Sequence, residues 1–173
     1  GGGGAGGAAH ARKTVKWHVL GSPRANNSNV VVFPYDTKSK SVTLITEYCP
    51  GPDAVLSGLP GGSYEPDKHD DLLHAALDEL NEESGLFARE LIPLTPNGMA
   101  MDKYSMTRLH CYLALDCQID DNPKPQDDTE DISVERGVSI EEVLARLEGG
   151  DMPGPSAMAA LLGIQRLREL ELL

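Results

Sequence analysis

The stretch that decides the fold of this chain is LPGGSYEPDKHDDLLHAALDELNEESGL, residues 59–86. A glycine turn leads into a predicted helix, which ends at Gly85 and carries in its last turns Glu79, Glu82 and Glu83. Residues three and four positions apart are neighbours on a helix surface, so these carboxylates repel one another. They also lie near the negative end of the helix dipole, where acidic side chains are disfavoured. A bound divalent cation would turn the repulsion into coordination by oxygen ligands, so the helix end is a predicted metal site.

The same helix has an apolar face that is spaced for packing on a sheet. Four apolar positions recur at helical spacing and are expected to face that sheet: Leu73, Ala76, Leu77 and Leu80. Either Asp67 or Asp70 is expected to cap the first turn, and Gly85 to end the last one.

Composition limits the class of protein. The 173 residues suffice for one domain, which we expect over residues 12–173 after a flexible Gly/Ala-rich tail at residues 1–11. The formal net charge of −12 argues against direct nucleic-acid binding through phosphate contacts, which requires clustered Lys and Arg. The sequence contains no run of 18 apolar residues, so we expect no membrane-spanning helix. We expect a cytoplasmic protein, or an organellar one if a targeting peptide has been removed.

Strands and helices alternate along the rest of the chain. The patterns predict strands at residues 14–20, 29–33, 41–48, 108–116 and 132–138, and helices from Ser139 and over residues 156–173. The three cysteines have no C-x-x-C spacing, which excludes a zinc site of that type and indicates free, mostly buried thiols. The alternation predicts an α/β fold, a mixed sheet covered by helices on both faces as an α/β/α sandwich.

The stretch at 59–86 resembles the Nudix box, whose pattern is G-x5-E-x7-R-E-U-x-E-E-x-G-U with U an aliphatic residue. The second half, Glu79-Leu80-Asn81-Glu82-Glu83-Ser84-Gly85-Leu86, matches at every fixed position. The first half differs at three points: Asp70 stands for Glu, two extra residues separate Gly62 from Asp70, and Asp78 stands for Arg.

Beyond the box, the chain is similar to the ADP-ribose and ADP-sugar pyrophosphatase branch of the Nudix superfamily. The similar segments are residues 127–132, 139–142 and 147–151, in the same order as in that branch. Cys49 and Met101 stand where the branch usually has an arginine and a proline. The resemblance implies a metal-dependent hydrolase that cuts the diphosphate of ADP-ribose or a nucleotide sugar, and a homodimer.

The resemblance also implies a set of site residues. The Mg²⁺ ligands, with Mn²⁺ as an alternative ion, would be Gly61 through its carbonyl group, Glu79, Glu82, Glu83 and Glu130. Asp128 falls where the branch places a general base, and Glu82 would assist. Three residues outside the box are candidate substrate contacts: Trp17, Arg24 and Arg108. Trp17 would stack on a purine or, as the favoured alternative, pack in the core; Arg24 would meet phosphate or lie in solvent.

Asp78 leaves two functional hypotheses open. In the resembled family the arginine at this position holds the box carboxylates, whereas an aspartate adds charge and pairs with none of them. A basic residue from elsewhere would have to compensate, and the candidates are Lys68, Arg89, Lys103 and Arg108. Without such a residue, the alternative is a catalytically weak or inactive Nudix-fold subunit that acts as a scaffold or ligand sensor.

Overall fold

A mixed β-sheet forms the centre of the molecule, whose computed structural model describes residues 16–126 and 131–173. Strand β1 (Ser28–Asp36) runs parallel to β8 (Arg108–Leu115), and β1 carries a run of apolar and β-branched residues that are buried on both faces. The order of the main strands is β10 (Ser133–Ser139), β2 (Ser41–Cys49), β1, β8 and β6 (Leu91–Pro93). All pairings other than β1 with β8 are antiparallel, which makes the sheet mixed.

Short strands extend this sheet, and none of them was expected from the sequence. Strand β3 (Ala54–Gly58) pairs with β2, β4 (Gly61–Ser63) pairs with β1, and β7 (Met99–Ala100) pairs with β8. A separate two-stranded sheet is formed by β5 (Leu86–Phe87) and β9 (Gln118–Ile119). Strands of two to five residues carry too few side chains for a period-2 pattern to stand out.

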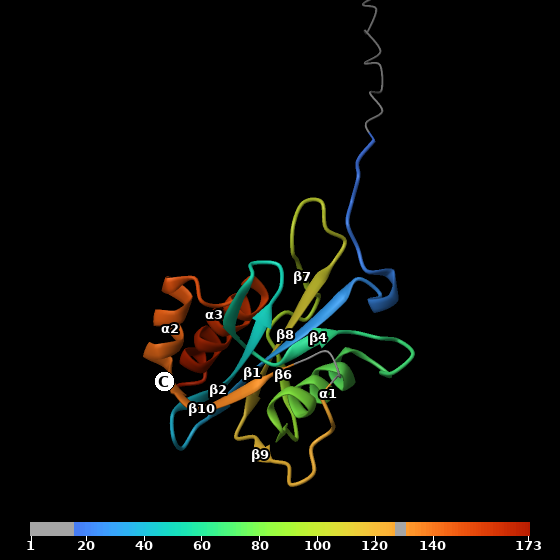
Figure 1. Cartoon of the computed structure of the whole chain (residues 1–173). Helices are drawn as coiled ribbons and strands as arrows, with labels where there is room; N and C mark the ends of the chain where they lie inside the picture. Colours follow the sequence, from blue (N-terminus) through green and yellow to red (C-terminus); the bar gives the residue numbers. More distant parts are fainter. Residues whose placement is uncertain (1–15, 127–130) are drawn as a thin grey trace, which may run out of the picture.

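Helices cover both faces of the sheet (Figure 1). Helix α1 (Leu72–Ser84) packs on one face over a core of buried residues that includes Val30, Val32 and Leu80. Helices α2 (Ile140–Gly149) and α3 (Gly154–Glu169) cover the other face, where Phe33 contributes to a larger core. The arrangement confirms the predicted α/β/α sandwich.

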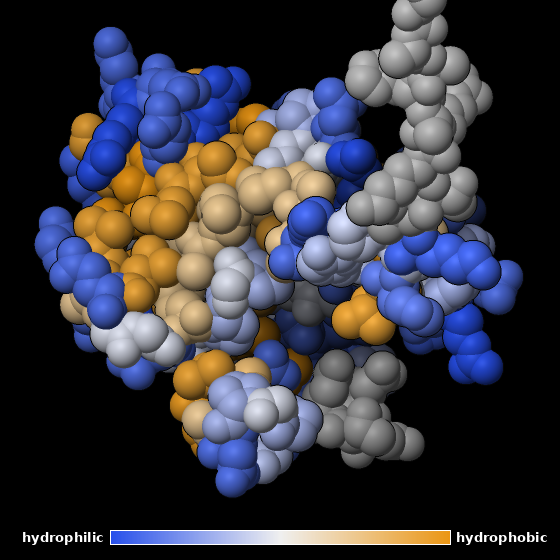
Figure 2. Space-filling view, turned by 90° about the horizontal axis from the view of Figure 1, so that it is seen from above, coloured by the Kyte–Doolittle hydropathy of each residue, from blue (hydrophilic) through white to orange (hydrophobic). Residues whose placement is uncertain are grey.

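The α2 and α3 side of the molecule also exposes apolar surface. Figure 2, seen from above, shows hydrophobic residues gathered on the left, the side on which Figure 1 places these helices. Met158 and Leu161 of α3 are 37% and 50% exposed. In the part of the chain that the structure describes, no helix is long and apolar enough to cross a bilayer.

Several local expectations were wrong. Residues 16–20 of the predicted first strand form only one isolated bridge, between Leu20 and Ser105, after which a short 3₁₀ helix (Pro23–Ala25) precedes β1. Helix α1 is capped by Asp71, not Asp67 or Asp70, because the Asp71 carboxylate accepts a hydrogen bond from the His74 N–H. Leu73 is 42% exposed, so the apolar face of α1 is rotated toward Ala75 and Ala76.

The termini of the chain were predicted less well than its centre. Helix α3 begins two residues before the predicted position and ends at Glu169, four residues before the predicted end. The predicted tail at residues 1–11 lies outside the described residues, and the expected single domain at 12–173 stays a prediction. Ser139 caps α2 as expected, accepting a hydrogen bond from the Glu142 N–H over 3.1 Å.

Candidate metal and substrate site

The carboxyl end of α1 is fixed to strand β4 by a buried carboxylate. Glu83 is 4% exposed, and its Oε2 accepts a hydrogen bond from the backbone N–H of Gly61 over 2.7 Å. A charge at this depth needs a strong partner, and a backbone N–H donated to a carboxylate is such a partner. The bond also offsets the unfavourable position of Glu83 near the negative end of the helix dipole.

The residues expected to form a glycine turn are instead part of β4, and the lack of side chains there lets α1 approach. Gly61 pairs with Val31 of β1, and a Cβ at residue 61 would overlap the backbone carbonyl of Val30. A Cβ at residue 62 would overlap Oε1 of Glu79. The neighbouring strand therefore requires glycine at residue 61, whereas a side chain at residue 62 would displace the Glu79 carboxylate.

A polar pocket of about 460 Å³ opens beside these carboxylates. Its lining combines groups of both charges from β4, the segment before α1, α1 itself and the segment after β9: Gly62, Ser63, Glu65, Lys68, His69, Asp78, Glu79, Glu82 and Lys124. Such a lining suits a charged, hydrogen-bonding ligand rather than an apolar one.

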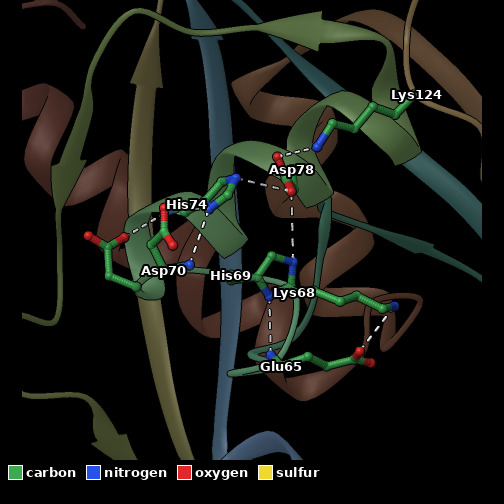
Figure 3. A network of polar contacts seen from close by, with 8 residues as sticks. Glu65, Lys68, His69, Asp70, His74, Asp78 and Lys124 are labelled. Atoms are coloured by element: carbon green, nitrogen blue, oxygen red, sulfur yellow. Dashed lines mark hydrogen bonds and ion pairs between the residues drawn. The ribbon is translucent and has the colours of Figure 1, made fainter.

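Asp78 pairs with Lys124, which was not among the four basic residues considered for this position. Lys124 Nζ lies 2.6 Å from Asp78 Oδ1, and the Asp78 side chain is only 16% exposed. The other oxygen, Oδ2, faces His69 Nε2 at 3.8 Å and His74 Nε2 at 3.5 Å (Figure 3). The expected surplus of negative charge at Asp78 is thus compensated by a lysine from a distant part of the chain.

Backbone contacts favour one tautomer of the neutral ring in both histidines. His69 Nδ1 accepts the Glu65 N–H over 3.1 Å, and His74 Nδ1 accepts the Asp70 N–H over 3.2 Å. A nitrogen that accepts cannot carry a proton, so each neutral ring is protonated on Nε2. Burial lowers the pKa of His69, which favours this neutral form.

Asn81 connects α1 to the segment after β9, a role that the box pattern does not predict. The Asn81 side chain accepts the Lys124 N–H over 2.8 Å and donates to Asp120 Oδ2 over 2.9 Å. Asn81 is 8% exposed, so these bonds are made in a largely buried setting. It occupies a variable position of the box pattern, which is why the motif did not identify it.

The three candidate substrate contacts lie elsewhere, around the starts of β1 and β8, and do not line the pocket. Trp17 is 60% exposed and contacts Tyr104, so the favoured core position was wrong. Arg108 donates to the Asn97 and Gly98 carbonyls, and Arg24 is exposed in the 3₁₀ helix.

The thiols take no part in this site. Burial raises the pKa of Cys111 to about 11 and that of Cys117 to about 12, and burial also raises the pKa of Cys49. All three are free cysteines, as expected, although only Cys111 is fully buried. Thiols with raised pKa values are weak nucleophiles and ligands at neutral pH.

The predicted metal ligands are brought together only in part. Asp128 and Glu130 lie outside the described residues. Among residues 16–126 and 131–173, no group of three or more His, Cys, Asp or Glu side chains is arranged to hold a metal ion. Glu83 Oε2 is directed at the Gly61 N–H. The donor chemistry nevertheless fits a hard divalent cation, because Glu79 and Glu82 line one pocket as oxygen donors and Glu83 packs on the adjoining strand.

The mixed sheet between helices and the carboxylates at the end of α1 define an α/β/α sandwich with an acidic candidate metal site. Comparison with known proteins gives the family. A model of the NUDIX domain matches residues 25–158, and the chain belongs to the NUDIX family. The family and the enzyme class predicted from the box, a Nudix-type diphosphatase, are confirmed.

Other comparisons support the fold or give no match. A crystal structure described as "ADP compounds hydrolase" is similar, with a TM-score of 0.71 and 23% identity, covering 84% of this chain and 75% of that one. At this identity the likeness concerns the fold. No curated protein matches the chain.

Proposed function

We propose that the chain hydrolyses the diphosphate linkage of a nucleoside diphosphate derivative such as ADP-ribose or a nucleotide sugar in a metal-dependent reaction. The products would be a nucleoside monophosphate and a phosphorylated second moiety. The observation that carries this proposal is the packing of α1 on β4, with Glu79 against Gly62 and Glu83 bound to Gly61, beside a charged pocket of about 460 Å³.

Five groups would hold Mg²⁺ or Mn²⁺ in this proposal: the Gly61 carbonyl, Glu79, Glu82, Glu83 and Glu130. The bound ion would neutralise the diphosphate charge and lower the pKa of the attacking water. Glu83 is oriented by the Gly61 N–H, which donates to its Oε2 over 2.7 Å. Asp128 is the proposed general base, with Glu82 in an assisting role.

The substrate class follows from two lines of support. The resembled branch acts on ADP-ribose and ADP-sugars, and the similar crystal structure is described as a hydrolase of ADP compounds. The pocket is polar and carries lysines as well as carboxylates, as recognition of a phosphorylated ligand requires. Trp17, Arg24 and Arg108 lie outside that pocket, so any substrate contact they make would involve the distal moiety or a second subunit.

The proposed enzyme is a homodimer, as in the resembled branch. Size-exclusion chromatography with light scattering would give twice the monomer mass of 18.6 kDa. A monomeric mass would contradict this part of the proposal without affecting the chemistry at α1.

The test of the function is a substrate panel assayed with Mg²⁺ and with Mn²⁺. It contains ADP-ribose, several nucleotide sugars, dinucleoside polyphosphates and capped RNA, and follows the release of nucleoside monophosphate. We expect turnover of at least one nucleoside diphosphate derivative, abolished by EDTA and restored by the ion. No turnover of any of them would instead favour the scaffold hypothesis.

A further inference from the structure

We propose that Lys124 binds the phosphate groups of the ligand in the carboxylate pocket, and that Asp78 is a positioning residue that acts through it. The inference deepens the proposed function and rests on it, because it requires a diphosphate in this pocket. Neither residue occupies a position to which the box pattern would assign phosphate binding.

Lys124 is held at both its backbone and its side chain. Its N–H donates to Asn81 Oδ1 over 2.8 Å, and its Nζ lies 2.6 Å from Asp78 Oδ1. The two anchors are three residues apart on α1, so they belong to adjacent positions on one rigid helix. The Lys124 side chain is nevertheless 47% exposed and lines the pocket. An ammonium group has three donors, so the contact with Asp78 leaves capacity for a ligand.

Asp78 is oriented by the two histidines that face its other oxygen (Figure 3). Because His69 and His74 are protonated on Nε2, both present N–H groups toward Asp78 Oδ2. The distances of 3.8 and 3.5 Å are longer than hydrogen bonds, so the attraction is electrostatic.

The charge of the pocket explains why a fixed cation is needed. Four carboxylates line it, from Glu65, Asp78, Glu79 and Glu82, against two lysines. Lys68 lies 3.0 Å from Glu65 in a pair whose side chains are 60% and 44% exposed, so this pair is close to solvent. Lys124 instead pairs with Asp78, whose side chain is less exposed than that of Glu65. Asp78 lies on the same helix as Glu79 and Glu82. Lysine binds phosphate as a point charge. Because the carboxylates of the pocket repel a phosphate group, a positive charge is needed there to bind it.

The test measures the Kd of ADP in the presence of Mg²⁺ by isothermal titration calorimetry. This measurement does not depend on turnover. The variants are Lys124→Met, Lys124→Arg, Asp78→Asn and the double variant Lys124→Met/Asp78→Asn. Lys38→Met is the matched control, because Lys38 is exposed in the turn between β1 and β2 and does not line this pocket.

We expect Lys124→Met to raise the Kd by about 10- to 100-fold, the range of one charge-assisted hydrogen bond. Lys124→Arg should retain most of the affinity, and Lys124→Met should weaken the salt dependence of binding. Asp78→Asn should raise the Kd by a smaller factor. If Asp78 acts through Lys124, the double variant binds as Lys124→Met alone does, which is the non-additivity of two residues in one unit. Thermal unfolding close to wild type would exclude a folding defect.

Wild-type affinity in Lys124→Met, or the same loss in Lys38→Met, would overturn the inference. Additive losses in the double variant would overturn the part that concerns Asp78. The substrate panel tests the proposed function separately. A protein that fails to turn over any substrate, yet binds Mg²⁺-ADP through Lys124, would refute the enzyme and support this inference.

Discussion

The Glu83 carboxylate and the Gly61 N–H, 22 residues apart in sequence, are joined by a hydrogen bond of 2.7 Å. This bond links the last turn of α1 to β4, and it joins the buried Glu83 to the partly buried Gly61. The position of the box carboxylates therefore depends on the backbone of β4 as much as on the helix. A change in either element should affect the site.

Gly62→Ala should disrupt the site without unfolding the protein. The added Cβ would overlap Glu79 Oε1, so the Glu79 side chain has to move. We expect turnover and Mn²⁺ affinity to fall by about tenfold or more, as is common when a positioned group is displaced by about 1 Å. The matched control is Gly51→Ala, where a Cβ would meet nothing within 4 Å. Equal Mn²⁺ binding by both variants in electron paramagnetic resonance titrations would contradict the assignment of Glu79.

Gly163→Ala should destabilise the packing of α3 on the sheet. A Cβ at residue 163 would overlap the Phe33 ring, which is fully buried. Overpacking of this kind costs about 1–3 kcal/mol, against a gain of up to about 1 kcal/mol from the helix propensity of alanine. Urea unfolding measures the difference in the free energy of unfolding between Gly163→Ala and the wild type. Gly154→Ala, where the Cβ would meet nothing within 4 Å, should leave stability unchanged or slightly raised.

The Arg146–Glu135 ion pair should make stability depend on acid pH. Arg146 donates to both Glu135 oxygens over 2.6 and 2.9 Å, and these bonds hold the pKa of Glu135 below its usual value of 4.5. A carboxyl group whose pKa is lowered by folding stabilises the folded state at pH values above its pKa in the unfolded chain. This stabilisation is lost as the pH falls through its pKa in the folded state. Because Glu135 is 45% exposed, the effect should stay below about 1 kcal/mol. Unfolding curves at pH 7 and below pH 4.5 give the free energy of unfolding at each pH. The difference between the two values should be smaller for Arg146→Met than for the wild type. An equal difference would contradict the role of the pair.

Trp17 should report an exposed environment. It is the one tryptophan of the chain, it is 60% exposed, and Lys103 Nζ lies 5.1 Å from its ring centre. We expect fluorescence emission close to that of free tryptophan in water and strong quenching by acrylamide. Trp17→Phe should change the free energy of unfolding by less than about 0.5 kcal/mol, as surface substitutions usually do. Blue-shifted, poorly quenched emission would contradict this position.

The parts of the fold that the sequence predicted are those with long periodic patterns. The apolar run of β1 and the capped α2 were both predicted, because burial and capping act on consecutive residues. The segment at 14–20 has a strand-like composition, but its described residues 16–20 make a single bridge, because they lie beside the loop between β7 and β8 and not beside a strand. Composition favours a strand only where a partner strand is available.

The candidate site residues that the structure brings close together all belong to one motif. The glutamates of α1 and the glycines of β4 belong to one stretch of the chain, so the box pattern identified them together. The partner of Asp78 was missed because Lys124 is 46 residues away, and charge alone does not select one lysine among several. Asn81 was missed for a similar reason, since its partners lie after β9.

The most direct test of metal-dependent hydrolysis at the end of α1 compares the turnover of ADP-ribose with Mg²⁺ by the wild type, Glu83→Gln and the control Glu141→Gln. Glutamine can still accept the Gly61 N–H, so Glu83→Gln should fold with nearly unchanged stability while losing the ligand charge. We expect turnover by the wild type and by Glu141→Gln, and a loss of about 100-fold or more in Glu83→Gln, since one metal-binding charge is removed. Equal turnover by the wild type and Glu83→Gln would contradict this expectation, as would turnover by neither.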